Sequence, residues 1–159
     1  MPAGTVSRRD ARGRPRPVCR LRRAAPERGR LAGFERRRSD GAGGHFIDRA
    51  LLARREASRL SDVLRGGAPG IQLQRMAGGG FALVSSRSAG SADPRRPLPC
   101  YVQLFVDGVK RFGQSMALGS LAPPNIDQYQ VNELAAIELY GGAASTPPDF
   151  SGRDAVCGT

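Results

Sequence analysis

The apolar run Tyr101–Val106 leads directly into Asp107-Gly108, and this junction constrains the fold more than any other stretch of the chain. Asp-Gly favours a two-residue hairpin turn, because both central residues of a type I′ turn need positive φ angles. The run before the turn is therefore predicted to be a strand that reverses at Asp107-Gly108. An antiparallel hairpin is the most secure local element of the fold.

Two short helices are predicted upstream of this hairpin. Asp48 is placed to cap a helix over residues 49–56, and Ser58 is placed to cap a second helix over residues 58–65. The apolar face of the second helix has i, i+3, i+4 spacing and consists of Leu60, Val63 and Leu64. Gly66-Gly67 then supplies a left-handed stop for this helix.

Strands are predicted on both sides of the hairpin. Ile71 and Leu73 alternate with glutamines over residues 71–75, as in a half-buried strand, and a second strand is predicted at Phe81–Arg87. Near the end of the chain, a short helix at Val131–Ala135 leads into a strand at Ala136–Tyr140. The sequence therefore predicts an α+β fold in which a small mixed β-sheet packs against two or three short helices.

The order of these elements gives a sharper topological expectation. The strands at residues 71–75, 101–106 and 136–140 are expected to share the one mixed sheet. The helix at 58–65 is expected to pack on the face of that sheet through its apolar residues.

Charge divides the chain of 159 residues unevenly, and its net charge is +11. Residues 1–40 hold 13 arginines against 4 acidic residues, whereas residues 97–159 hold 3 basic residues against 6 acidic ones. Residues 1–33 also lack any apolar period, so we expect a disordered basic arm or linker there, followed by one domain over residues 34–159. A basic arm of this kind favours nucleic acid as an alternative partner, and Arg12–Pro17 has the sequence of an AT-hook core.

The three cysteines do not match a zinc site, because Cys19, Cys100 and Cys157 lack the close pairs that such sites need. Cys100 and Cys157 can pair in an oxidising compartment. Closing their 57-residue separation would stabilise the fold by about 4 kcal/mol in the chain-entropy model. Cys19 would then be left over.

No catalytic, cofactor-binding or metal site is predicted. His45 is the only histidine. With Ser61 and Asp62 it would give the residue types of a nucleophile–base–acid trio, but the strained nucleophile turn of hydrolases is missing from the sequence. No apolar run reaches the length of a membrane-spanning helix, and the amino terminus carries charges where a signal peptide needs an apolar stretch.

Three motifs together resemble the plug domain of TonB-dependent outer-membrane receptors. The segments are "RLSDVLRGGAPGIQL", "LFVDGV" and "LAAIELYGGAAS", and they occur in the order of that family between Leu60 and Gly152. The matching positions, to which the resemblance gives structural or interaction roles, are Leu60, Asp62, Leu64, Pro69, Gly70, Asp107, Gly108, Ile137, Glu138, Gly142 and Ser145.

A closer resemblance is to short plug-like proteins that carry "GFxxRR" before the first helix, here Gly33–Arg38, and Cys-Gly after the last loop. Such proteins usually add an N-terminal carboxypeptidase-regulatory-like domain and a last apolar strand, and neither is expected in this chain. This chain also has Gly141 where the family usually has Arg, Ala143 where it has Pro, and a link before Pro69-Gly70 that is one residue longer.

The resemblance implies a non-enzymatic plug-like domain without a cofactor, located at the outer membrane or in the periplasm and active in uptake or signalling. It also implies two partners, which are an outer-membrane barrel and an energy-transducing protein that pulls on a segment before the plug. Because 159 residues are too few for a barrel of about 22 strands, the chain is expected to hold only the plug-like domain, as a periplasmic binding or signalling module, as part of a longer receptor, or as a remnant of one. The alternative is a nucleic-acid-binding protein that acts through its Arg-rich arm.

Overall fold

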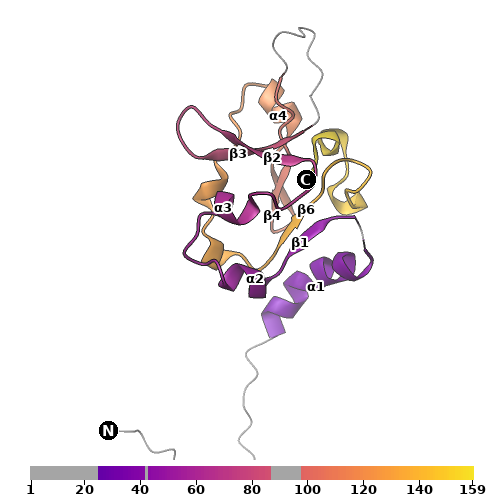
Figure 1. The fold of residues 1–159 in the computed structure, drawn as a ribbon. Helices are drawn as coiled ribbons and strands as arrows, with labels where there is room; N and C mark the ends of the chain where they lie inside the picture. The colour runs from indigo at the N-terminus through magenta and orange to yellow at the C-terminus, as the bar shows by residue number, and fades with distance from the viewer. Residues whose placement is uncertain (1–24, 42, 87–97) are drawn as a thin grey trace, which may run out of the picture. The chain divides into compact units, whose positions relative to one another are not determined.

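The computed structural model describes residues 25–41, 43–86 and 98–159, with side chains from Leu31 onward. The chain divides into two compact units, Met1–Arg30 and Leu31–Thr159, and all the strands lie in the second (Figure 1). The α-helices are α1 (Ala25–Ser39), α2 (Arg49–Ala53), α3 (Leu60–Leu64) and α4 (Gln114–Leu118). The 3-10 helices are η1 (Ile126–Gln128), η2 (Val131–Glu133), η3 (Pro148–Phe150) and η4 (Arg153–Cys157).

The strands are short and pair two by two. They are β1 (His45–Ile47), β2 (Ile71–Arg75), β3 (Phe81–Ser85), β4 (Leu104–Val106), β5 (Val109–Phe112) and β6 (Ile137–Leu139). The pairs are β1–β6, β2–β3 and β4–β5, and all three are antiparallel. The predicted α+β class is therefore confirmed, but the prediction of one mixed sheet that holds β2, β4 and β6 is wrong.

Backbone hydrogen bonds outside the strands connect these three pairs. Val84 of β3 forms an antiparallel bridge with Tyr101, just before β4. Gln103 N donates to Gly158 O (3.0 Å), and Tyr140 and Thr159 exchange N–H···O bonds of 2.6 and 2.8 Å. Residues 158–159 thus lie between β6 and the segment before β4, where a sheet would need another strand (Figure 1). One or two bonds at each junction are too few to form a continuous ladder.

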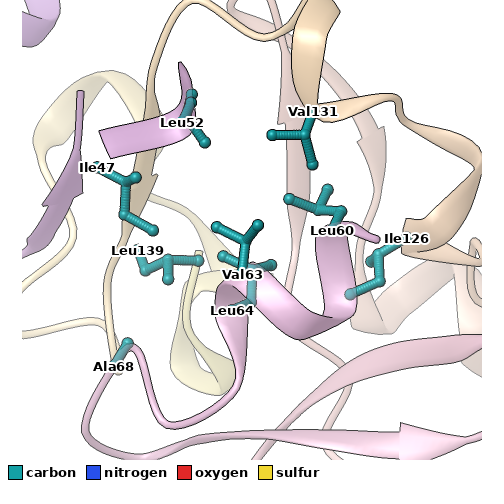
Figure 2. Close-up of a cluster of buried hydrophobic side chains, with 9 residues drawn as sticks. All are labelled: Ile47, Leu52, Leu60, Val63, Leu64, Ala68, Ile126, Val131 and Leu139. Atoms are coloured by element: carbon teal, nitrogen blue, oxygen red, sulfur yellow. The ribbon is translucent and has the colours of Figure 1, made fainter. Parts of the chain in front are cut away.

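The hydrophobic core lies around α3 (Figure 2). The predicted apolar face of this helix is confirmed, because Leu60, Val63 and Leu64 are each 7% exposed. Besides these three, the buried residues of the cluster are Ile47, Leu52, Ala68, Ile126, Val131 and Leu139. Side chains of β2 and β3 pack against the cluster from outside, so the helix packs on strands, as expected.

The two predicted helix caps have different outcomes. Asp48 caps α2 by accepting a hydrogen bond from Leu51 N (2.9 Å), and this bond is the largest cause of a lowered pKa of the Asp48 carboxyl. Ser58, however, does not cap α3. The helix begins after Arg59, and Ser61 N donates instead to Oδ1 of Asp127 (2.9 Å), which comes from η1.

Helix α1 corrects the expectation of an irregular segment up to residue 33, because the helix already begins at Ala25. Pro26 is tolerated there, since the first turn of a helix does not need its missing N–H. The rest of the expected arm, with Cys19 and Arg12–Pro17, lies outside the described residues.

Helix α4 has no counterpart among the predicted elements. Its first turn is capped by a residue distant in sequence, because Asp154 accepts hydrogen bonds from Ser115 N and from Ser115 Oγ, both 2.8 Å long. Lys110 Nζ lies 2.5 Å from the same carboxylate. Burial acts to raise the pKa of Asp154, but the hydrogen bonds from Lys110 and Ser115 outweigh burial, so this pKa is lowered.

The predicted hairpin turn is confirmed between β4 and β5. Asp107 and Gly108 have φ angles of 52° and 76°, as a type I′ turn requires. The strand before the turn is shorter than predicted, since Tyr101 belongs to the bridge with β3 and only Leu104–Val106 pairs with β5.

A disulfide joins Cys100 and Cys157, whose Cα atoms lie 5.3 Å apart. Cys157 directly precedes the two residues that connect β6 to the segment before β4. The bond therefore holds the end of the described chain in the gap between the strand pairs.

Removing this disulfide is expected to destabilise the fold by about 4 kcal/mol, because a closed 57-residue separation restricts the unfolded chain. The measurement is urea unfolding of the wild type and of the Cys100→Ser/Cys157→Ser variant. Dithiothreitol should destabilise the wild type and leave the double variant unchanged. Equal unfolding midpoints for the oxidised wild type and the variant would contradict this.

Candidate functional site

The carboxylate of Glu138 is the centre of a charged network on β6. Arg37 of α1 binds it with two hydrogen bonds, from Nε to Oε2 (2.8 Å) and from Nη2 to Oε1 (2.6 Å). The Tyr140 hydroxyl donates a third, to Oε2 (2.6 Å). The side chains of Arg37 and Glu138 are only 14% and 15% exposed, so this is a largely buried, two-pronged ion pair.

Aromatic side chains surround this ion pair. Phe34, Phe46 and Tyr140 form a chain of edge-to-face contacts, with ring centroids 5.6 and 6.0 Å apart. The Arg37 guanidinium also lies 4.8 Å from the centre of the Phe150 ring, within range of a cation–π interaction. Helix α1 is therefore fixed to β1 and β6 by a charge and by apolar contacts together.

The environment of the network keeps Arg37 and Tyr140 in their ordinary charge states. The hydrogen bond with Glu138 raises the pKa of Arg37, so its guanidinium remains charged. Burial, followed by the hydrogen bond to Glu138, raises the pKa of Tyr140, so its hydroxyl remains a donor. The arrangement suits binding and fixation, because neither group is poised to transfer a proton near neutral pH.

A glycine-lined pocket of about 790 Å³ lies next to the network. It is lined by Gly43, Gly44, His45, Ala68, Pro69, Gly70, Ser86, Leu139, Gly141, Gly142, Ala144 and Ser145. Its walls are mainly backbone and small side chains, and among the described residues His45 is the only ionisable side chain that lines it. Such a pocket offers peptide N–H and C=O groups to an occupant and contains no activated nucleophile.

Close approach of chain segments explains the glycines. A Cβ atom on Gly141 would lie 2.7 Å from Pro69 O, and a Cβ atom on Gly44 would lie 2.4 Å from the Tyr140 ring. Neither position has room for a side chain. The turn at residues 68–70 therefore packs directly on the backbone that follows β6.

The structure separates the residues singled out from the sequence into several places. Pro69, Gly70, Gly142 and Ser145 come together in the glycine-lined pocket. Leu60 and Leu64 are core residues, and Ile137 packs against that core. Asp107 and Gly108 form the hairpin turn, which does not line the pocket.

His45, Ser61 and Asp62 do not come together as a nucleophile–base–acid trio. His45 lines the pocket, whereas Ser61 is buried at the start of α3 and Asp62 pairs with Arg65 at 3.5 Å. Within the described ranges, no group of three His, Cys, Asp or Glu side chains could hold a metal ion. No helix in that part of the chain is long and apolar enough to cross a membrane.

From the sequence, Glu138 is expected either to face solvent or to pair with an arginine, but its particular partners, Arg37 and Tyr140, were not predicted. Arg37 and Phe34 belong to the GFxxRR motif, but the motif does not say what they contact. For Tyr140 the sequence predicts only that it ends a strand. A lone acidic residue inside an apolar strand was the available signal, since a buried carboxylate requires a cation.

Comparison with known families identifies the class of this chain. The family model of the TonB-dependent receptor plug domain matches residues 43–158, which include β1, β6 and every residue that lines the pocket. The chain therefore belongs to the TonB-dependent receptor plug domain family, a non-enzymatic receptor component associated with the outer membrane. No curated protein and no solved structure matches the chain.

Two departures from the family pattern meet at one contact. This chain has Gly141 where the resemblance places Arg, and its link before Pro69-Gly70 is longer by one residue. The carbonyl of Pro69 occupies the space that the first side-chain carbon of residue 141 would need. Glycine is therefore required at 141 by the path that the link takes in this chain.

We expect Gly141→Ala to destabilise the domain by about 1–3 kcal/mol, because its Cβ would overlap the Pro69 carbonyl. Gly78→Ala is the matched control, since a Cβ there would meet nothing within 4 Å and should change stability by less than about 0.5 kcal/mol. Thermal unfolding of both variants gives the comparison. A Gly141→Ala variant as stable as the control would show that the 68–70 turn does not lie on residue 141.

Proposed function

We propose that residues 34–159 act as a non-enzymatic plug-like domain in outer-membrane uptake or signalling. The family match over residues 43–158 carries this proposal. The packing supports it, because Glu138, Gly142 and Ser145 of the plug signature converge on the network and the pocket. The Arg-rich sequence before α1 is then an arm or linker that precedes the domain.

The proposed partners follow from the family. The domain would fill the lumen of an outer-membrane barrel, and an energy-transducing protein would pull on the chain before the domain. A polar barrel lumen suits the exposed charged side chains at the start of α2 and in the turn after it, which are Arg49, Arg54, Arg55 and Glu56. The glycine-lined pocket is the proposed place for contact with a ligand, whose identity the lining residues do not specify.

The test is electrical conductance through a receptor barrel whose own plug has been removed. Residues 31–159 are fused ahead of the barrel, and the barrel is inserted in a planar bilayer. The fusion is expected to lower the conductance to that of an intact receptor, because the domain fills the lumen. The control is the same fusion with residues 31–159 in scrambled order. Conductance equal to that of the empty barrel, in several different barrels, would overturn the proposal.

Nucleic-acid binding through the Arg-rich arm is a second candidate function, favoured by the excess of 13 arginines over 4 acidic residues in residues 1–40. It requires that the full chain bind duplex DNA with an affinity that falls steeply with salt, because neutralised phosphates release counterions. A variant without residues 1–30 should then lose this binding. Anisotropy of a labelled duplex at several salt concentrations distinguishes the two functions.

A further inference from the structure

Helix α1 covers one face of the β1–β6 pair, and this face is separate from the pocket. Neighbouring residues of a strand point to opposite faces. Phe46 and Glu138 contact α1, and Tyr140 contacts both of them, whereas His45, Leu139 and Gly141 line the pocket. We call the α1-facing surface the clasp face, and it comprises Phe46, Glu138, Tyr140, Asp149 and Phe150.

Two residues of α1 supply most of the contact with the clasp face. Phe34 and Arg37 are three positions apart, so they lie on the same side of the helix. Phe34 is 4% exposed and packs edge-to-face against Phe46. Arg37 reaches Glu138, Asp149 (3.4 Å) and the Phe150 ring. The clasp face therefore binds an aromatic side chain and a guanidinium group that lie about one helical turn apart.

Glycines lie in the short connection between α1 and β1. Gly41 and Gly43 have φ angles of 64° and 66°, and a Cβ on Gly41 would meet nothing within 4 Å. Asp40 N and Gly41 N donate back to α1, at Arg36 O and Arg38 O. These two bonds would move with the helix, and the end of α1 is tied to the rest of the domain by the Arg38–Asp48 ion pair (3.1 Å), which can also form between two copies. The family match begins only at residue 43, after α1.

We propose that the clasp face is a recognition site for a helix that presents Phe-x-x-Arg, filled in cis by α1 and open in trans to α1 of a second copy of this chain. Such an exchange keeps every contact between α1 and the clasp face. A short connection holds α1 at an effective concentration on the order of millimolar. The wild type therefore keeps its own α1 at micromolar concentration and is a monomer there.

Charge reversal in two separate chains tests this without the barrel or any ligand. Arg37→Glu and Glu138→Arg each place like charges at the clasp, so neither chain can close it in cis. In an equimolar mixture, each α1 finds a complementary clasp face on the other chain. We expect native mass spectrometry and analytical ultracentrifugation to show a 1:1 heterodimer in the mixture and monomers in each separate sample.

The matched control is a mixture of Arg36→Glu with Glu138→Arg. Arg36 is exposed, and its one ion pair in the described residues, with Asp149 at 3.9 Å, is exposed as well. Reversing its charge leaves the Arg37–Glu138 pair intact, so no heterodimer should form. If the Arg37→Glu and Glu138→Arg chains both keep hydrogen-exchange protection of α3 amides and still remain monomers when mixed, recognition in trans is wrong.

A milder variant covers the case in which charge reversal prevents folding. A labelled peptide of residues 25–41 is titrated into the Arg37→Gln chain, and a peptide with Phe34→Ala and Arg37→Ala serves as control. The wild-type peptide should bind at least about ten-fold more tightly, because it alone supplies the ring and the guanidinium. Equal affinities of the two peptides, or no saturable binding of either, would overturn the proposal.

Discussion

A carboxylate inside an apolar strand is the constraint on which the arrangement of α1, β1 and β6 depends. Glu138 lies between Ile137 and Leu139, and its side chain is 15% exposed. A charge in such a place is tolerated only when it is paired and hydrogen-bonded. Arg37 and Tyr140 meet this requirement with three hydrogen bonds. The need to neutralise Glu138 thus decides which part of α1 contacts the domain, and the aromatic contacts of Phe34 follow from it.

The second constraint is that three short strand pairs must be joined. Pairs of three to five residues are marginal by themselves, and here they are connected by a bridge at Tyr101 and by the backbone of Gly158 and Thr159. The Cys100–Cys157 disulfide fixes both connecting segments at once, since each cysteine directly precedes one of them. The disulfide therefore fixes the end of the described chain beside β6, and the Arg37–Glu138 ion pair fixes α1 to β6.

Local chemistry explains which elements could be predicted from the sequence. The Asp107-Gly108 turn, the Asp48 cap, the apolar face of α3 and the alternation in β2 each depend on residues within a few positions of one another. The missed features depend on distant residues. At the start of α3, Ser61 N donates to Asp127, which is 66 positions away. The first turn of α4 is capped by Asp154, which is 39 positions away from Ser115. The pocket could not be predicted from the sequence either. Backbone and small residues form much of its lining, and the spacing of its glycines along the chain follows no period.

A double-mutant cycle at Arg37 and Glu138 tests the central claim most directly. The free energy of unfolding in urea is measured for the wild type, Arg37→Gln, Glu138→Gln and the double variant. Each single change should cost about 3 kcal/mol, because it leaves a largely buried polar or charged partner unpaired. The double variant should cost little more than either, which gives a coupling energy of about 2–3 kcal/mol. Additive effects, with a coupling below about 0.5 kcal/mol, would show that Glu138 does not depend on Arg37 and would contradict the account.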